Sequence, residues 1–511
     1  MLIEKRVDSC FRDLLSGMIE RRTIIIKHIA GDRAGQVRYG RFLCNEKVTP
    51  ERIVEQATAR TGAAVTGKHV LLIEDSSQIS FGLTPRAAGL GSIGTGTTSG
   101  FYIHPVLAVD ADQRACYGLA AASVFKRPDL PPELQGADLK ARKKYWYKQS
   151  FTDKSSKRWL DVPLLAQQCC ATAARLTVIA DREGDIYEAL DGFQTAGLDF
   201  VVRMSGDRLL DGPGQQRRRQ QVQASVQKSK ARKAKQANDA SDVSDAAAAA
   251  DERQAPQPES ASPDQVLIAT VREQLNALAP AGSYELKLPA TDKRSAHTAT
   301  LDIKYMPARI LRPQTMASRR SSPALDVYVV EVQERASSVV GKEKPVHWVL
   351  VTSHPVTRID QAMQIVEWYR WRWDIEQTFR LLKSRGMDIE SSGLQTYERL
   401  ANLAAMALVA AVRVLQLVLA RDHTTSQLLG TAFSEAETAF LQVLNKGLEG
   451  STVKQRNPHP VGSLAYGSWV IARLGSWMCY GKTPPGPITM HRGLMRFYEQ
   501  FEGYRLATGA T

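Results

Sequence analysis

The segment Glu367-Trp-Tyr-Arg-Trp-Arg-Trp-Asp-Ile-Glu-Gln-Thr-Phe-Arg-Leu-Leu-Lys383 contains no Gly or Pro, and its pattern predicts a helix. At about 100° per residue, the side chains of Tyr369, Arg372, Glu376 and Lys383 fall within an arc of about 60°. One carboxylate, two cations and a phenol therefore face the same way. Such a face suits a metal-bound phosphodiester, although exposed helix faces lined with ion pairs are more common.

Two acidic residues elsewhere in the chain directly follow short apolar runs. These runs are Lys68-His-Val-Leu-Leu-Ile-Glu-Asp75 and Arg175-Leu-Thr-Val-Ile-Ala-Asp181. A buried strand that ends in this way places a carboxylate at the edge of a sheet. Further strands are predicted at residues 101–109, 115–124, 199–204, 326–332 and 347–352, with a helix at 186–193. Together these elements predict an α/β fold in which helices cover both faces of a mixed sheet.

The 511-residue chain carries a net charge of +14, which favours a polyanionic partner, with nucleic acid the first candidate and an acidic membrane the second. The longest uncharged apolar run, Leu400–Val412, is bounded by Arg399 and Arg413 and is too short to cross a bilayer. The N-terminus has no apolar signal core, and the six cysteines form no Cys-x-x-Cys pair. A cytoplasmic protein with reduced thiols is therefore predicted, without a disulfide framework or a zinc site.

Changes in composition and pattern predict five regions along the chain. In chain order they are a basic helical region that contacts DNA (1–60), the first part of the sheet core (61–211), an insertion (212–325), the second part of the core with the Glu376 helix (326–397), and a helical C-terminal region (398–511). An ordinary solvated face is the alternative for the first region. The insertion divides into a disordered low-complexity stretch at 212–265 and a small β subdomain at 266–325.

The spacing Tyr-x2-Arg-x3-Glu-x6-Lys over residues 369–383 resembles the signature of the IS-four family of bacterial insertion-sequence transposases, most closely its Tn-five-like branch. The run Asp181-Arg-Glu-Gly-Asp185 is similar to the second motif of that family. The resemblance extends from about Gly31 to Leu506. It implies a ribonuclease-H-like fold with a β-rich insertion and helical terminal regions, and an active site made of two Asp and one Glu.

Carried onto this chain, the resemblance makes Asp75, Asp181 and Glu376 the catalytic residues and the metal ligands. Carboxylate oxygens without a nearby Cys or His select Mg²⁺ or Mn²⁺ over Zn²⁺. Two ions per active site are expected, and in such sites they lie about 3.5–4 Å apart and act on the attacking and leaving oxygens. Four other acids compete for these roles, namely Glu74, Asp110, Glu183 and Asp185. Glu183 and Asp185 are expected instead to cap or pair near the start of a helix.

The resemblance also implies contacts with double-stranded DNA. Tyr369, Arg372 and Lys383 would hold phosphates, since guanidinium and ammonium groups pair well with them. Arg380 falls on the same helix face and is either a further contact or an exposed helix residue. Trp348 and Trp373 match family positions that handle a base flipped out of the duplex. From its own surroundings in the sequence, Trp348 is better explained as a core residue of a buried strand.

The predicted function is that of a cut-and-paste DNA transposase. By family likeness it would nick an element end, form and reopen a hairpin, and join the freed end to target DNA, acting as a homodimer and without a membrane partner. Residues 466–478 would be a dimer contact or an internal core helix. The first alternative is a nuclease of the same fold that cuts and never joins. The second is a non-catalytic DNA-binding or inhibitory derivative of a transposase.

Overall fold

The computed structural model describes residues 9–508, with a long gap at 212–269 and short gaps at 12, 16, 19–23, 83–86, 95–97, 129–130, 135, 292–293, 316–317, 343, 384–386, 423–425 and 481–482. The stretch predicted to be disordered, 212–265, therefore lies outside the described residues.

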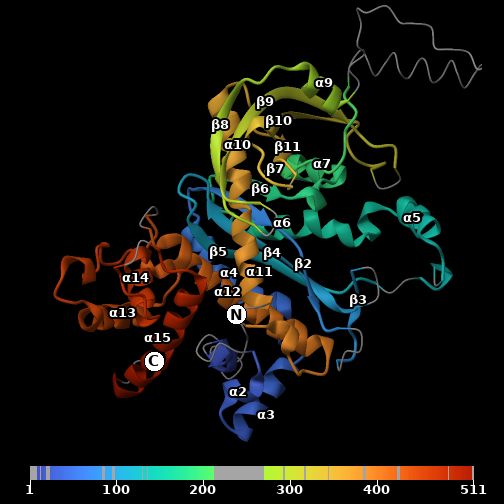
Figure 1. Ribbon diagram of the computed structural model, residues 1–511. Coiled ribbons are helices and arrows are strands. Elements are labelled where there is room, and N and C mark those ends of the chain that lie inside the picture. The colour runs from blue at the N-terminus through green and yellow to red at the C-terminus, as the bar shows by residue number, and fades with distance from the viewer. Residues whose placement is uncertain are drawn as a thin grey trace, which may run out of the picture.

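Five strands form the central part of a mixed sheet (Figure 1). They are β1 (His69–Glu74), β4 (Thr98–Asp110), β5 (Cys116–Phe125), β6 (Arg175–Ala180) and β7 (Asp199–Arg203). Their spatial order is β5-β4-β1-β6-β7. Strand β4 pairs antiparallel with β5 and β1, whereas β6 runs parallel to both β1 and β7.

The sheet is buried on both faces, and the side chains of β1 show this most clearly. Val70 and Leu72 face the helices α6 (Arg158–Cys169) and α7 (Tyr187–Thr195). Leu71 and Ile73 belong to the core on the opposite face, with α4 (Pro50–Ala64), α10 (Ile359–Trp371), α11 (Trp373–Lys383) and α12 (Tyr397–Ala420). Successive side chains of a strand point to opposite faces, so a continuous apolar run marks a strand covered on both sides. The predicted α/β architecture is confirmed.

Four more strands widen the sheet beyond β7. In spatial order they are β11 (His347–Thr352), β10 (Ala324–Glu334), β9 (His297–Leu311) and β8 (Gly282–Leu288). The strands at 282–311 fall in the range predicted to form a small β subdomain of the insertion, 266–325. Strand β9 pairs with β10 over the whole length of β10, from Ala324 to Glu334, which joins the insertion to the main sheet. The short strands β2 (Ser77–Ser80) and β3 (Gly91–Ile93) attach to the other end through β4.

The described residues of the N-terminal part are mostly helical. It includes α2 (Ile26–Ala30), α3 (Arg33–Leu43) and α4, which continues to Ala64. Helix α4 begins at Pro50, which suits a first helical position, and the Thr49 hydroxyl accepts a hydrogen bond from the Arg52 N–H at 3.4 Å. Whether this region binds DNA remains a prediction.

The C-terminal part consists of α12 and the helices α13 (Glu435–Leu448), α14 (Leu464–Leu474) and α15 (Pro487–Thr508) (Figure 1). Helix α12 is long and apolar enough to cross a membrane by length and composition, but 83% of its most apolar window is buried inside the protein. It is a central core helix. Helix α14 is buried too, with Trp469 4% exposed and Ile471 fully covered. Helix α14 covers residues 466–474 of the predicted 466–478 and packs inside the chain, whereas Met478 is 67% exposed.

Candidate active site

The ends of two neighbouring parallel strands bring Asp75 and Asp181 together. In the pairing of β1 with β6, Ile73 lies opposite Ile179. Asp75 and Asp181 each follow two residues later, so both carboxylates leave the same edge of the sheet at the same level. This placement follows from the register, because parallel strands deliver their carboxyl ends to one edge.

Glu376 reaches this edge from α11, the second half of the helical segment. The helix predicted for this segment is observed as α10 and α11, with only Arg372 between them, and the Arg372 backbone keeps helical angles (φ −51°, ψ −31°). Asp374, near the start of α11, holds this helix in place, and its side chain is fully buried. The Arg114 guanidinium donates to both carboxylate oxygens of Asp374, at 2.9 Å from Nε and 2.6 Å from Nη2. This bidentate pair ties α11 to the turn between β4 and β5.

The Arg372 guanidinium contacts all three predicted catalytic acids. Its Nη1 lies 2.8 Å from Asp75 Oδ2, and its Nη2 lies 3.5 Å from Asp181 Oδ2 and 3.2 Å from Glu376 Oε1. Two carboxylates that share one nitrogen cannot be farther apart than the sum of their distances to it. The structure therefore brings the three acids together from three separate parts of the chain.

The three acids place negative charge in a site that is partly shielded from water. Burial raises the pKa of Asp75 to about 6, and the nearby Asp181 and Glu376 carboxylates push it further in the same direction, against the Arg372 cation. Burial lowers the pKa of Arg372, but its carboxylate partners outweigh burial and hold it above the usual value. Three acids with one guanidinium leave an excess of negative charge, which a divalent cation would relieve.

The donor set fits a hard divalent cation. It offers carboxylate oxygens only, and these are the ligands that Mg²⁺ and Mn²⁺ prefer. Over the described residues, no three His, Cys, Asp or Glu side chains stand close enough to form a ready metal cage. Arg372 lies between the three carboxylates and keeps them spread around itself. A metal ion bound by Asp75, Asp181 and Glu376 therefore requires the guanidinium to move outward.

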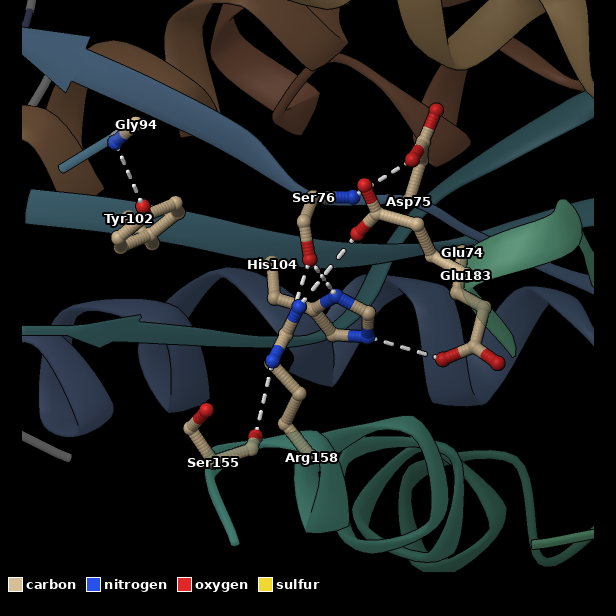
Figure 2. A network of polar contacts seen from close by, with 9 residues as sticks. All are labelled: Glu74, Asp75, Ser76, Gly94, Tyr102, His104, Ser155, Arg158 and Glu183. Atoms are coloured by element: carbon tan, nitrogen blue, oxygen red, sulfur yellow. Dashed lines mark hydrogen bonds and ion pairs between the residues drawn. The ribbon is translucent and has the colours of Figure 1, made fainter. Parts of the chain in front are cut away.

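A buried polar network lies directly behind Asp75 (Figure 2). The Ser76 N–H donates to Asp75 Oδ1 at 2.7 Å, and the Ser76 hydroxyl lies 2.8 Å from His104 Nδ1 and accepts from Arg158 Nε at 3.0 Å. His104 Nε2 lies 2.9 Å from Glu74 Oε2, and both of these side chains are fully buried. The network fixes Ser76, and Ser76 in turn orients Asp75.

Burial decides the protonation of this network. It raises the pKa of Glu74 well above its usual value and lowers the pKa of His104 well below its own, with Arg158 adding to the second effect. Burial therefore favours the neutral form of both groups. A protonated Glu74 donates to His104 Nε2, and His104 donates through Nδ1–H to the Ser76 hydroxyl. The second oxygen of Glu74 has no hydrogen-bond partner in the described part of the chain.

The residues predicted to contact DNA have different environments. Tyr369 and Arg372 are 2% and 4% exposed, so neither presents a free surface. Trp348 is half-buried and meets the Tyr369 ring edge to face at 5.6 Å, as a core residue of β11 would. Trp373 is 52% exposed, with the Arg372 guanidinium 5.8 Å from its ring centre. Of these four, Trp373 offers the most accessible surface.

The two remaining predicted contacts lie farther along α11. Lys383 is half-buried, and burial lowers its pKa although Glu390 acts in the opposite direction. Arg380 is exposed. Their contacts with phosphates remain predictions.

The competing acids have structural partners. Asp110 Oδ1 accepts from the backbone N–H groups of residues 112 and 113, and Oδ2 accepts from the Tyr117 hydroxyl. Asp185 pairs with Arg208, and Glu183 lies 3.7 Å from Arg158, in agreement with the pairing expected for both. No sequence motif identified Ser76 and Arg158, or placed His104 behind Asp75. A histidine inside the apolar run 101–109 was the one available signal.

The strand order β5-β4-β1-β6-β7, with acids at the ends of β1 and β6, defines a ribonuclease-H-like α/β fold. Residues 161–413 match the family model described as Transposase DDE domain. The matched range contains Asp181 and Glu376 and begins after Asp75. This match supports a DDE transposase, a class of enzyme that acts on DNA and generally uses divalent metal ions.

Proposed function

We propose that this protein is a cut-and-paste DNA transposase of the Tn-five-like branch of the IS-four family, with Asp75, Asp181 and Glu376 as its catalytic residues. The observation that carries the proposal is the meeting of these three acids at one guanidinium, at the edge of a ribonuclease-H-like sheet. The transposase-domain match over residues 161–413 supports the same class.

The three carboxylates would hold Mg²⁺ or Mn²⁺. Two such ions would lower the charge on the scissile phosphate and activate an attacking oxygen. Arg372 supplies the remaining positive charge. Its guanidinium can exchange carboxylate oxygens for phosphate oxygens, because both groups offer negatively charged oxygens that accept from its N–H groups.

The residues of the chain also set the geometry of the reaction. Asp75 is held by the Ser76 N–H, and Glu376 is held through the Asp374–Arg114 pair on the same helix. Fixed acids of this kind favour an in-line displacement at phosphorus, in which one oxygen attacks as the opposite one leaves. Nicking, hairpin formation, hairpin opening and strand transfer are all displacements of this type, so one site can perform them in sequence.

The exposed Trp373 suits the hairpin steps. A base extruded from the duplex loses its stacking, and an aromatic ring at the site edge replaces part of it. Trp348 would support Tyr369 by packing against its ring. Tyr369 would in turn support Arg372, whose guanidinium lies 5.9 Å from the Tyr369 ring centre. A homodimer on paired ends is part of the proposal, with a contact surface other than the buried α14.

The test is a strand-transfer assay with purified full-length protein. A precut duplex end taken from the flanking sequence of the gene is incubated with plasmid DNA and Mg²⁺. The proposal predicts covalent joining of the end to the plasmid. Cleavage of a flanked end without any joining would identify a nuclease of the same fold, and DNA binding without either reaction would identify a non-catalytic derivative.

A further inference from the structure

Helix α5 (Leu139–Lys148) has a composition unlike that of any neighbouring element. Its sequence Leu-Lys-Ala-Arg-Lys-Lys-Tyr-Trp-Tyr-Lys contains five cations and three aromatic residues and no acid. In Figure 1 it stands apart from the helices that cover the sheet. The fold gives α5 little apolar surface to bury, so packing alone does not account for it.

Three lysines of α5 form a single stripe. Lys140, Lys144 and Lys148 are spaced four residues apart and fall within an arc of about 80°, with a rise of about 6 Å between successive side chains. All three are exposed. Within the described ranges, no carboxylate forms an ion pair with any of them. A row of like charges four residues apart is unfavourable by itself, so the row needs an anionic partner.

A groove continues this charge beyond the end of the helix. It has a volume of about 720 Å³ and lies between the C-terminal end of α5 and the turn from β9 to β10. The cations that line it are Lys148, Arg309, Arg312 and Arg319, and among the described lining residues Asp211 is the one acid. The Tyr147 hydroxyl donates to the Gln314 carbonyl at 3.3 Å and joins the helix to this turn. The stripe and the groove together form one basic surface.

This surface is connected to the candidate active site along the chain. Residues 149–157 lead from α5 into α6, which begins at Arg158. Arg158 donates to Ser76 and pairs with Glu183, the neighbours of Asp75 and Asp181. The same segment of the chain therefore supplies α5 and, ten residues after its end, a contact with the neighbours of the acids.

We propose that α5 is a DNA-binding arm, with Lys140, Lys144 and Lys148 on the phosphates of a duplex outside the active site. This inference rests on the proposed function only in taking DNA as the substrate. Lysines on a single stripe position a duplex by its backbone and read no sequence. An anionic membrane is the less suitable partner, because among the α5 side chains whose exposure the structure describes, the large exposed apolar ones are Trp146 and Tyr147, at adjacent positions and not along one continuous face.

The test compares two full-length triple variants with the same change of charge. K140Q/K144Q/K148Q removes the stripe, and K342Q/K446Q/K454Q removes three exposed lysines from other surfaces. Affinity for a duplex of unrelated sequence is measured in EDTA over a range of salt concentrations. Each phosphate contact contributes about 0.9 to the slope of log K against log salt, so the stripe variant should lose about 2 to 3 of that slope. The control variant should keep the slope of the wild type.

Equal slopes for the two triple variants would overturn the proposal that α5 binds DNA. A second measurement uses vesicles of phosphatidylserine and phosphatidylcholine. If the stripe variant loses vesicle binding and keeps full DNA binding, the surface is a membrane contact and the proposal fails. Failure of the arm is separable from failure of the proposed function. If the wild-type protein joins a precut end but the two triple variants have equal slopes, the proposed function holds and the DNA-binding role of α5 fails. If the wild type joins no end but the stripe variant loses slope, the DNA-binding role of α5 holds and the proposed function fails.

Discussion

Arg372 holds three acids that come from distant parts of the sequence. Its guanidinium reaches Asp75, Asp181 and Glu376, and its own burial strengthens each contact by excluding water. The spacing of four residues predicted its nearness to Glu376. The contacts with the two Asp residues depend on the register of β1 and β6, which local spacing does not contain.

Replacing Arg372 by Met should destabilise the protein in EDTA, because three partly buried carboxylates lose their shared cation. The expected loss is about 2–3 kcal/mol in the free energy of unfolding, below the value for a fully buried pair because the acids are partly exposed. Millimolar Mn²⁺ should restore most of this loss, since a divalent ion can take the place of the guanidinium. Thermal unfolding with and without Mn²⁺ measures both effects. If D181N/R372M is rescued equally, the acids do not bind the ion.

Trp373→Ala should leave the folded protein nearly unchanged, because the side chain is half exposed. Affinity for a duplex end with an unpaired terminal base should fall by about 1–3 kcal/mol if the ring stacks on that base. Competition binding against a fully paired end isolates the stacking contribution. The same affinity loss on both ends would contradict base contact.

The two acidic strand ends were predictable element by element. Apolar runs followed by Asp identified β1 and β6, and both acids lie where a parallel pair delivers them. The helix predicted from Glu367 to Lys383 is observed as α10 and α11, with only Arg372 between them. The pair that anchors α11 was not predictable, because Arg114 lies 260 residues from Asp374 in the sequence and adopts a left-handed backbone conformation with φ of 56°.

Arg114→Ala should cost about 2–3 kcal/mol of stability, because a fully buried Asp374 carboxylate loses its bidentate partner. Cleavage activity should fall with it, since Glu376 lies on the anchored helix. Arg114→Gly is the matched control, because it removes the same pair but relieves about 1 kcal/mol of backbone strain. Chemical denaturation of the two variants gives the comparison. If the Arg114→Gly variant is no more stable than the Arg114→Ala variant, the backbone at residue 114 is not strained.

The arrangement of the whole chain was only partly predictable. The covered sheet and the helical ends follow from apolar patterns. The attachment of β8 and β9 to the main sheet does not, because alternation specifies a strand and leaves its partner open. Nor can an apolar helix pattern distinguish an internal core from a subunit contact, and α14 shows the internal case.

The dependence of protein stability on pH tests whether His354 is buried against the sheet. Burial lowers the pKa of His354 to about 4, with Arg175 acting in the same direction and Asp199 opposing it. The unfolded chain takes up this proton near pH 6.5, so stability falls as the pH drops from about 6.5 towards 4. Asp75, whose pKa is raised to about 6, has the opposite sign over part of this range.

His354→Asn isolates the histidine contribution from that of Asp75. The stability difference between wild type and variant should be about 2 kcal/mol smaller at pH 5 than at pH 7.5. Urea unfolding at the two pH values measures it. A difference that does not change with pH would mean that His354 is not held neutral by burial.

The most direct measurement is cleavage of a duplex element end by Asp181→Asn and Glu376→Gln in Mn²⁺, with binding of the same duplex followed in parallel. The wild type should cut only when the divalent ion is present. Both variants should bind the duplex with an affinity close to that of the wild type and show no cleavage. Cleavage by either variant at the wild-type rate would contradict the assignment of these acids as the catalytic centre.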